Sequence, residues 1–386
     1  MKCVYKNKRN IIWGYIAVVG LLMAGCRKTD FPDVSSPAYL RVFNCLTYNV
    51  SIDNKDAPQP FMTMLIDPQL DASGVPVGAD VTFDFLATRG PLARPYPDAG
   101  NTALWQKEFP GTAKIPVGPI VNGYDLSGYG MVKSGKHRFL FMARPRSSDP
   151  FYTLPVSARK KVLADTTVNL DQGEIYTMNI LEKSVRTRET GVYLRKELFT
   201  KIPLSDSLVY TNFYNLSSEG YAQTYVFDEN SGNVCIRDTM NIFYSLYAKG
   251  RAIPGFTNVF TGGIVRSQDP VVHPYNSFPL FPDSTASHIY AGTAGQLFNI
   301  LSPGTPPDQG LQSGTAKGSY TSFALGPEAP VAVFNLGGDV RTGMVITVYS
   351  GIYNPRSFAT INTVEYVNGN MYITTLQRRY DPPIYK

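Results

Sequence analysis

The stretch Tyr-Leu-Arg-Val-Phe at residues 39–43 shows the pattern that decides the fold. Its residues follow a period of two, which is the spacing of side chains along a β-strand. Gly, Pro, Asn and Asp occupy the gaps between this run and later ones, and these residues mark turns. Similar short runs recur along the chain, at residues 81–85, 138–142, 176–181, 192–195, 210–214, 223–227, 331–334, 344–349 and 371–376.

Helical patterns are scarce in the sequence, and residues 242–249, the one short candidate, are equally compatible with a strand. Many short strands with turns between them are typical of antiparallel β-sandwiches. The length of 386 residues suits two or three domains. We therefore expect an all-β chain with two tandem antiparallel β-sandwich domains of the immunoglobulin-like kind, at residues 38–200 and 201–386.

Two stretches resemble each other and support this division. The sequence RVFNCLTYN in the first half aligns with NFYNLSSEG in the second, which places Asn44 on Asn215 and Cys45 on Leu216. Each stretch would open the first strand of a domain, so duplication of one fold is one explanation. The other explanation is that aromatic–Asn pairs are common at strand ends. The Pro- and Gly-rich residues 53–134 predict a long loop insertion in the first domain.

The net charge of +6 is concentrated at the N-terminus. The basic residues Lys2, Lys6, Lys8 and Arg9 precede Gly25, and no Asp or Glu does. The remaining 32 basic residues nearly balance the 30 acidic ones. The body of the chain therefore lacks the electrostatic footprint of a nucleic-acid-binding protein, and we expect no nucleic-acid partner.

The first residues have the layout of an export signal. A basic region is followed by an apolar run at residues 11–23 and then by Ala24, Gly25 and Cys26. This order is typical of a signal peptide, which we assign to residues 1–25. A membrane-spanning anchor is the alternative, but the apolar segment is shorter than the ~20 residues needed to cross the hydrocarbon of a bilayer.

The sequence Leu-Met-Ala-Gly before Cys26 resembles the lipobox of bacterial lipoproteins. The resemblance implies that the Cys26 thiol takes the lipid and that Cys26 becomes the mature N-terminus. Met23 departs from the family pattern, in which a branched aliphatic residue is commoner. Several acyl chains, at about 0.8 kcal/mol per buried CH₂, would anchor the protein to a membrane without spanning it, with residues 26–37 as a polar tether. An ordinary secreted protein, cleaved near Gly25 without lipid, is the alternative.

Two of the four cysteines remain once Cys3 is removed with the signal peptide and Cys26 is acylated. Cys45 and Cys235 each lie within an apolar, strand-like run. We expect them to be small buried residues, and a disulfide between the halves is the alternative.

The sequence contains no complete catalytic or metal-binding motif. Residues 130–136 have the glycine and lysine spacing of a phosphate-binding loop, but His137 stands where a Ser or Thr is needed, and a strand pattern follows. Residues 228–233 resemble part of a calcium loop, but Thr239 replaces the required Glu. We therefore interpret both stretches as turns. We expect no enzymatic activity, no cofactor and no metal, although sequence alone cannot place paired carboxylates of a glycan hydrolase.

Aromatic residues gather in the loop-rich part of the first half. The apolar face of a sugar stacks on an aromatic ring, so aromatic residues in loops are candidates for ligand binding. The candidate residues are Trp105, Tyr96, Tyr124 and Tyr129. The alternative is that these large side chains fill the core.

The chain as a whole resembles surface lipoproteins of the Bacteroidota, on its leader and on the strand opening Tyr39-Leu-Arg-Val-Phe-Asn44. The resemblance implies an outer-membrane lipoprotein, often on the extracellular face, that binds glycans or other proteins. The leading hypothesis is a lipid-anchored envelope protein that recognises a glycan or a partner protein through long loops. A structural subunit of a fimbria-like or envelope assembly is the alternative, and a glycan hydrolase is third.

Overall fold

The structure of the chain is a computed structural model. Contacts between Cα atoms divide the chain into Met1–Asp33 and Val34–Lys386. This division does not test the predicted boundary near residue 200, which stays a prediction. The residues that the structure describes are 33–46, 61–86, 108–111, 113–121, 124–198, 201–202, 208–220, 238–248, 251–269, 273, 276–279, 294–301, 303–304, 319–325, 357–367 and 370–379.

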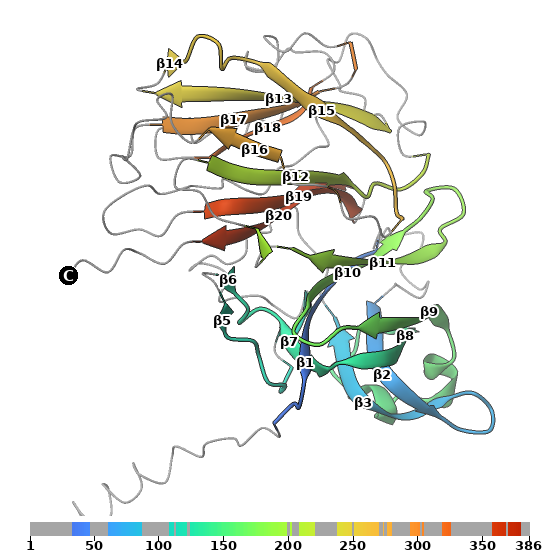
Figure 1. Cartoon of the computed structure of the whole chain (residues 1–386). Coiled ribbons are helices and arrows are strands. Elements are labelled where there is room, and N and C mark those ends of the chain that lie inside the picture. Colours follow the sequence, from blue (N-terminus) through green and yellow to red (C-terminus); the bar gives the residue numbers. More distant parts are fainter. Residues whose placement is uncertain are drawn as a thin grey trace, which may run out of the picture. The chain divides into compact units, whose positions relative to one another are not determined.

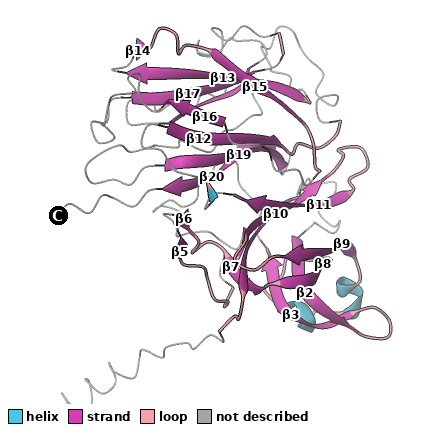
Figure 2. Ribbon diagram, viewed as in Figure 1, coloured by secondary structure: helices cyan, strands magenta, loops and turns pink. Residues whose placement is uncertain are grey.

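Strands dominate the described residues, as Figure 2 shows (magenta). The helical elements are short 3₁₀ turns, among them η3 (Phe151–Thr153) and η4 (Val156–Arg159). The short helical candidate at 242–249 falls largely in strand β13 (Thr239–Ala248). The expectation of an all-β chain with several antiparallel sheets is therefore confirmed, and the immunoglobulin-like arrangement stays a prediction.

Strand β1 (Pro37–Cys45) is central in the first sheet (Figure 1). It pairs antiparallel with β4 (Glu108–Phe109) and β7 (Gly130–Lys133) and parallel with β10 (Ile175–Glu182). Strand β11 (Thr190–Glu197) continues the sheet beyond β10. The parallel pair differs from the expected all-antiparallel pairing. It is possible because the chain builds the second sheet between β1 and β10, which gives parallel neighbours the long connection they need.

The second sheet is antiparallel throughout. Its order is β3-β2-β8-β9. The strands are β2 (Phe61–Leu70), β3 (Pro76–Phe85), β8 (Gly135–Arg144) and β9 (Val162–Leu170).

Both faces of β1 are buried, because successive side chains of a strand point to opposite sides. Leu40 and Val42 join the apolar cluster shared with the second sheet. Phe43 and Cys45 join another cluster, which also contains Tyr214 from the second half of the chain. The expectation that Cys45 is buried is confirmed, whereas Cys235 lies outside the described residues.

The second half repeats this strand order (Figure 1). Strand β12 (Leu208–Asn215) pairs parallel with β19 (Ser357–Val367) and antiparallel with β16 (Asn276–Pro279), as β1 pairs with β10 and β7. Strand β20 (Asn370–Arg379) pairs with β19, as β11 pairs with β10. The other sheet has the order β14-β13-β17-β18, and β15 also pairs with β13. The bounds of these strands are β14 (Arg251–Ala252), β15 (Val259–Val265), β17 (Ala294–Leu301) and β18 (Ser319–Leu325).

Asn44 and Asn215 end equivalent strands with the same hydrogen bond. Oδ1 of Asn44 accepts from the backbone N–H of Leu46 at 3.2 Å, and Oδ1 of Asn215 accepts from the backbone N–H of Ser217 at 3.1 Å. Each asparagine therefore turns the chain at the strand end. Together with the repeated strand order, this shared turn favours duplication of one fold over a chance likeness of strand ends.

A buried ion pair lies where strands of the two halves meet. Arg195 in β11 donates through Nε to Oε1 of Glu197 at 3.0 Å and through Nη1 to Oγ1 of Thr363 in β19 at 3.2 Å. Its guanidinium carbon lies 4.6 Å from the ring centroid of Tyr214. Burial acts to lower the pKa of Arg195, but the charge of Glu197 holds that pKa above its ordinary value. Burial also raises the pKa of Glu197.

Candidate ligand-binding site

The structure describes two of the five site residues expected from the sequence. Cys26, Tyr96 and Trp105 lie outside the described residues. Tyr124 lies in the short strand β6 (Tyr124–Asp125). Tyr129 is fully buried, with the Arg41 guanidinium 5.9 Å from its ring centroid, which agrees with the core-filling alternative for this ring. The ligand-binding role of the four aromatic residues remains untested.

The stretch that resembled a phosphate-binding loop spans strand β7, Ser134 and the start of β8. Gly135, at φ 128°, begins β8 where a phosphate-binding loop would start a helix. Nδ1 of His137 lies 2.6 Å from Oδ2 of Asp67, and its Nε2 lies 2.6 Å from the carbonyl oxygen of Lys133. The prediction that a strand and not a helix follows this stretch is confirmed, whereas the stretch itself is mostly strand and not turn.

Within the described residues, no group of three or more His, Cys, Asp or Glu side chains is arranged to hold a metal ion. No helix in the same residues is long and apolar enough to cross a membrane. The partial calcium-loop stretch at 228–233 lies outside this part of the chain.

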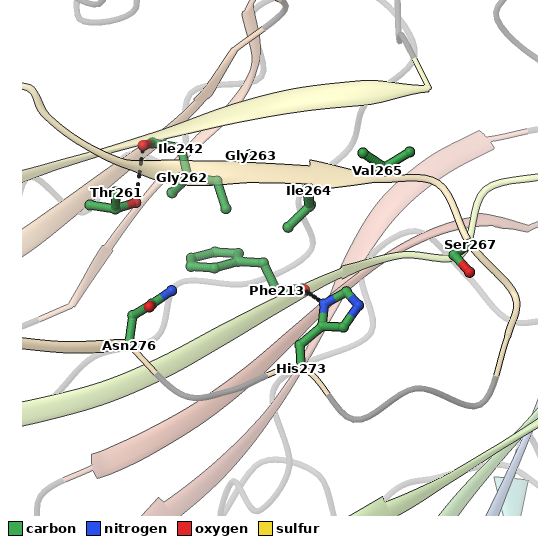
Figure 3. Close-up of a pocket in the computed structure, with 10 residues that line it drawn as sticks. All are labelled: Phe213, Ile242, Thr261, Gly262, Gly263, Ile264, Val265, Ser267, His273 and Asn276. Carbon is green, nitrogen blue, oxygen red and sulfur yellow. Dashed lines mark hydrogen bonds between the residues drawn. The ribbon is translucent and has the colours of Figure 1, made fainter.

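A cavity of about 390 Å³ lies between the two sheets of the second half. Strands β12 and β16 form one side, and the edge strand β15 with its neighbour β13 forms the other (Figure 3). Figure 3 shows the Ile264 side chain pointing from β15 toward the ring of Phe213 on β12. The lining residues are Phe213, Ile242, Thr261, Gly262, Gly263, Ile264, Val265, Ser267, His273 and Asn276.

A β-bulge shapes the wall that β15 gives to this cavity. Ile242 pairs with Gly262 and Phe243 with Phe260, so Thr261 is the extra residue. Oγ1 of Thr261 donates to the carbonyl oxygen of Ile242 at 3.0 Å and holds the bulge in place. Gly262 has φ 131°, which an L side chain rarely adopts. Glycine inside a strand often marks a place where another group approaches the backbone closely.

His273 is held by four contacts, although it lies outside the named strands. Its ring stacks on that of Tyr214, with centroids 4.3 Å apart and planes at 13°. Its backbone N–H donates to the Tyr214 hydroxyl oxygen at 2.9 Å, and its carbonyl oxygen accepts from Nδ2 of Asn212 at 3.3 Å. Nδ1 lies 2.8 Å from the carbonyl oxygen of Phe213. Because a carbonyl only accepts, Nδ1 carries the proton, and Nε2 of the neutral ring is an acceptor.

Burial raises the pKa of Tyr214 to about 12, so its hydroxyl stays protonated at neutral pH. Tyr214 also lies between His273 and the buried Arg195, since its ring contacts both side chains. The histidine is therefore supported, through Tyr214, by the buried Arg195 described above and not by its own loop alone.

The polarity of the cavity is mixed, but the ten lining side chains carry no fixed charge. Phe213, Ile242 and Ile264 are 3%, 3% and 7% exposed and supply an apolar floor. Ser267, His273 and Asn276 supply polar groups at the cavity. This combination is typical of a site for a small ligand.

Comparisons with known proteins add little to this geometry. No family model matches the sequence, and no curated protein matches it. Among solved structures, the crystal structure of a putative cell adhesion protein from Bacteroides uniformis aligns with 90% of this chain and 100% of that chain, at 7% identity and a TM-score of 0.16. A match with so low a TM-score does not show a shared fold.

Sequence reasoning missed this cavity because its residues come from separate segments. His273 was one of three scattered histidines, and Asn276 is one of two polar residues between the aromatic residues Tyr275 and Phe278. The one local signal is the Gly262-Gly263 pair inside the apolar run VFTGGIV, since two glycines are unusual within a strand.

Proposed function

We propose that the protein is a lipid-anchored, non-enzymatic protein of the cell envelope that recognises a glycan or a partner protein. The sequence before Cys26 supports the anchor. The observation that carries the binding role is the cavity beside β15, where a firmly held histidine meets an apolar floor. The outer membrane is the proposed location, with the protein on the extracellular face.

Cys26→Ser tests the anchor. The substitution removes the only thiol placed to take the lipid, and the nearly neutral body has little attraction to an anionic membrane. We expect the variant to accumulate as uncleaved precursor or to enter the soluble fraction, while the wild type stays with membranes through a high-salt wash. Fractionation followed by immunoblotting measures both.

Cys3→Ser is the matched control, since it changes a thiol within the proposed signal peptide and should leave the fractionation unchanged. A wild type that washes off in salt, or a Cys26→Ser variant that matures and fractionates normally, would show that the protein is not lipid-anchored.

The binding role is tested with purified full-length protein in detergent. We expect it to bind members of a broad glycan array or to co-purify with an envelope protein. If Trp105 takes part, Trp105→Ala weakens that binding. Failure in both assays would argue against the binding role without affecting the anchor.

One observation favours the second candidate, a structural subunit whose sheet edge is completed by a strand from a neighbour. Within the described residues, β15 pairs on one side only, with β13. It carries no charged residue, and Val259, Phe260 and Val265 are 40%, 58% and 58% exposed. Natural edge strands usually carry charge or proline, which prevents such pairing.

The corresponding edge strand of the first half, β3, is contacted at two points by its own chain. Nη1 of Arg159 donates to the carbonyl oxygen of Pro76 at 2.7 Å, and the hydroxyl oxygens of Tyr152 and Thr82 lie 2.9 Å apart. Strand β3 also carries Asp80 and Asp84. The edge strand β3 therefore carries charged residues and contacts its own chain, whereas the equivalent edge strand β15 carries no charged residue. For this reason β15 is the edge with which a neighbour's strand would pair.

Phe260→Lys tests this candidate. A lysine on the edge should oppose strand addition, so high-mass assemblies in unboiled membrane extracts should disappear from the variant. Val77→Lys, at a 56% exposed position on strand β3, is the control and should leave them intact. A wild type that runs as a clean monomer would contradict the structural-subunit role.

A further inference from the structure

We infer that the cavity between β12, β15 and β16 binds one uncharged, hydroxyl-bearing ring of the size of a single sugar residue. This inference rests on the proposed binding function and gives it a site and a class of ligand.

The absence of fixed charge among the ten lining residues indicates an uncharged ligand. The nearby Arg266 is already engaged, since its Nε donates to Oδ1 of Asp238 at 2.8 Å. An anionic ligand would meet no lysine or arginine in the lining, and a cationic ligand would meet no carboxylate there. Burying an unpaired charge is far more costly than burying a polar group that finds a hydrogen-bond partner.

The fixed tautomer of His273 indicates that the ligand donates a hydrogen bond. Nδ1 is committed to the Phe213 carbonyl oxygen, so the neutral ring offers its Nε2 lone pair as an acceptor. Figure 3 shows this second nitrogen on the side of the ring away from Phe213. Asn276, an exposed residue of β16, can both donate and accept. A hydroxyl group satisfies both kinds of partner, because it donates one hydrogen bond and accepts others.

The floor and the glycine wall indicate a flat, ring-shaped molecule. Phe213 and Ile264 face each other across the cavity and suit the apolar C–H face of a ring. Gly262 has no side chain, and the space where a side chain would lie is open, so a ligand can approach its backbone closely. A volume of about 390 Å³ lies at the small end of ligand pockets, which favours one ring over an extended chain.

The test uses purified full-length protein in detergent and the methyl glycosides of glucose, galactose, mannose and N-acetylglucosamine at millimolar concentrations. Saturation-transfer NMR detects binding, and a titration gives the affinity. We expect at least one neutral glycoside to bind. Asn276→Ala should weaken that affinity about 3- to 10-fold, the usual range for one lost hydrogen bond. Ser277→Ala, at the exposed next position of β16, is the matched control and should leave the affinity unchanged.

His273→Phe is the second variant, because it keeps a ring to stack on Tyr214 but removes both nitrogens. We expect it to lose detectable glycoside binding. If it does not fold by circular dichroism, Asn276→Ala decides the question alone.

Three results would overturn the inference: no neutral glycoside binds, binding is indifferent to Asn276→Ala, or only the anionic probe methyl glucuronide binds. Each is distinguishable from failure of the proposed function. Co-purification of an envelope protein would still support binding by another surface, and fractionation of Cys26→Ser tests the anchor independently.

Discussion

Replacing Arg195 with methionine should lower the free energy of unfolding at pH 7 by about 3–5 kcal/mol. The substitution leaves the Glu197 carboxylate in a dry interior, where both side chains of the native pair are almost fully buried, at 2% and 1% exposed. Methionine has a similar length and fills the space, so the loss comes from the unpaired charge rather than from a void. Denaturant unfolding of the purified protein measures the effect.

The same variant should be less destabilised in acid. Burial raises the pKa of Glu197 even with Arg195 present, and loss of the guanidinium removes a group that lowers it. When the folded-state pKa exceeds the unfolded value near 4.3, the folded state binds more protons than the unfolded state over the range between them. The contribution of Glu197 to stability is therefore favourable at low pH and is lost as pH rises through that range.

Two controls separate burial from ion pairing as such. The double change Arg195→Met with Glu197→Gln should recover much of the lost stability, because no charge is then left unpaired. Lys183→Met breaks a pair with Glu189 whose side chains are 49% and 61% exposed, and should cost less than about 1 kcal/mol. A single Arg195 variant as stable as the Lys183 variant would contradict the burial argument.

Phe298→Ala should lower the free energy of unfolding by about 3–5 kcal/mol, the usual cost of truncating a buried phenylalanine. The Phe298 ring is fully buried in β17. Its centroid lies 5.7 Å from Phe213, 5.5 Å from Tyr244 and 5.2 Å from Phe278, so its removal takes one ring contact from each of these three side chains. Denaturant unfolding measures this loss.

Phe260→Ala is the matched control, since it removes the same side chain from a position that is 58% exposed. We expect a loss of at most about 1 kcal/mol, because the ring is partly hydrated already, although its centroid lies 5.6 Å from that of Phe243. Equal losses for the two phenylalanine variants would contradict the packing described for the second half.

The strands could be predicted from the sequence because their pattern is local. The runs at 39–43, 138–142 and 176–181 lie within β1, β8 and β10. Strand neighbours could not be predicted, since a period of two indicates which side chains share a face but not which strand lies beside it. The parallel pairing of β1 with β10 was therefore missed.

Arg41 shows the same limit at the level of one side chain. It is 2% exposed, and its Nε donates to Oε2 of Glu108 at 3.0 Å. Glu108 lies in the Pro- and Gly-rich region expected to be loop or insertion, so nothing local indicated that it would meet β1. A buried arginine needs a partner, but the sequence does not say where that partner lies.

The candidate site was the least predictable feature, because ligand cavities combine residues that only the tertiary structure brings together. The lining residues come from four places in the chain: Phe213 from β12, Ile264 from β15, His273 from the segment before β16, and Asn276 from β16. The aromatic residues chosen from the sequence were selected by local clustering, and among them Tyr129 proved to be fully buried.

The parallel pairing of the first strand of each half has a kinetic consequence. Asn44 lies opposite Ile180 and Asn215 lies opposite Val364, so neither β1 nor β12 can pair with its parallel neighbour until almost all of its half has been synthesised. Contacts between residues so distant in sequence delay folding, because the intervening chain must lose its entropy first. A chain with this delay stays unfolded for longer after it leaves the ribosome, and for the export proposed above an unfolded chain is the form that a narrow translocation channel can admit.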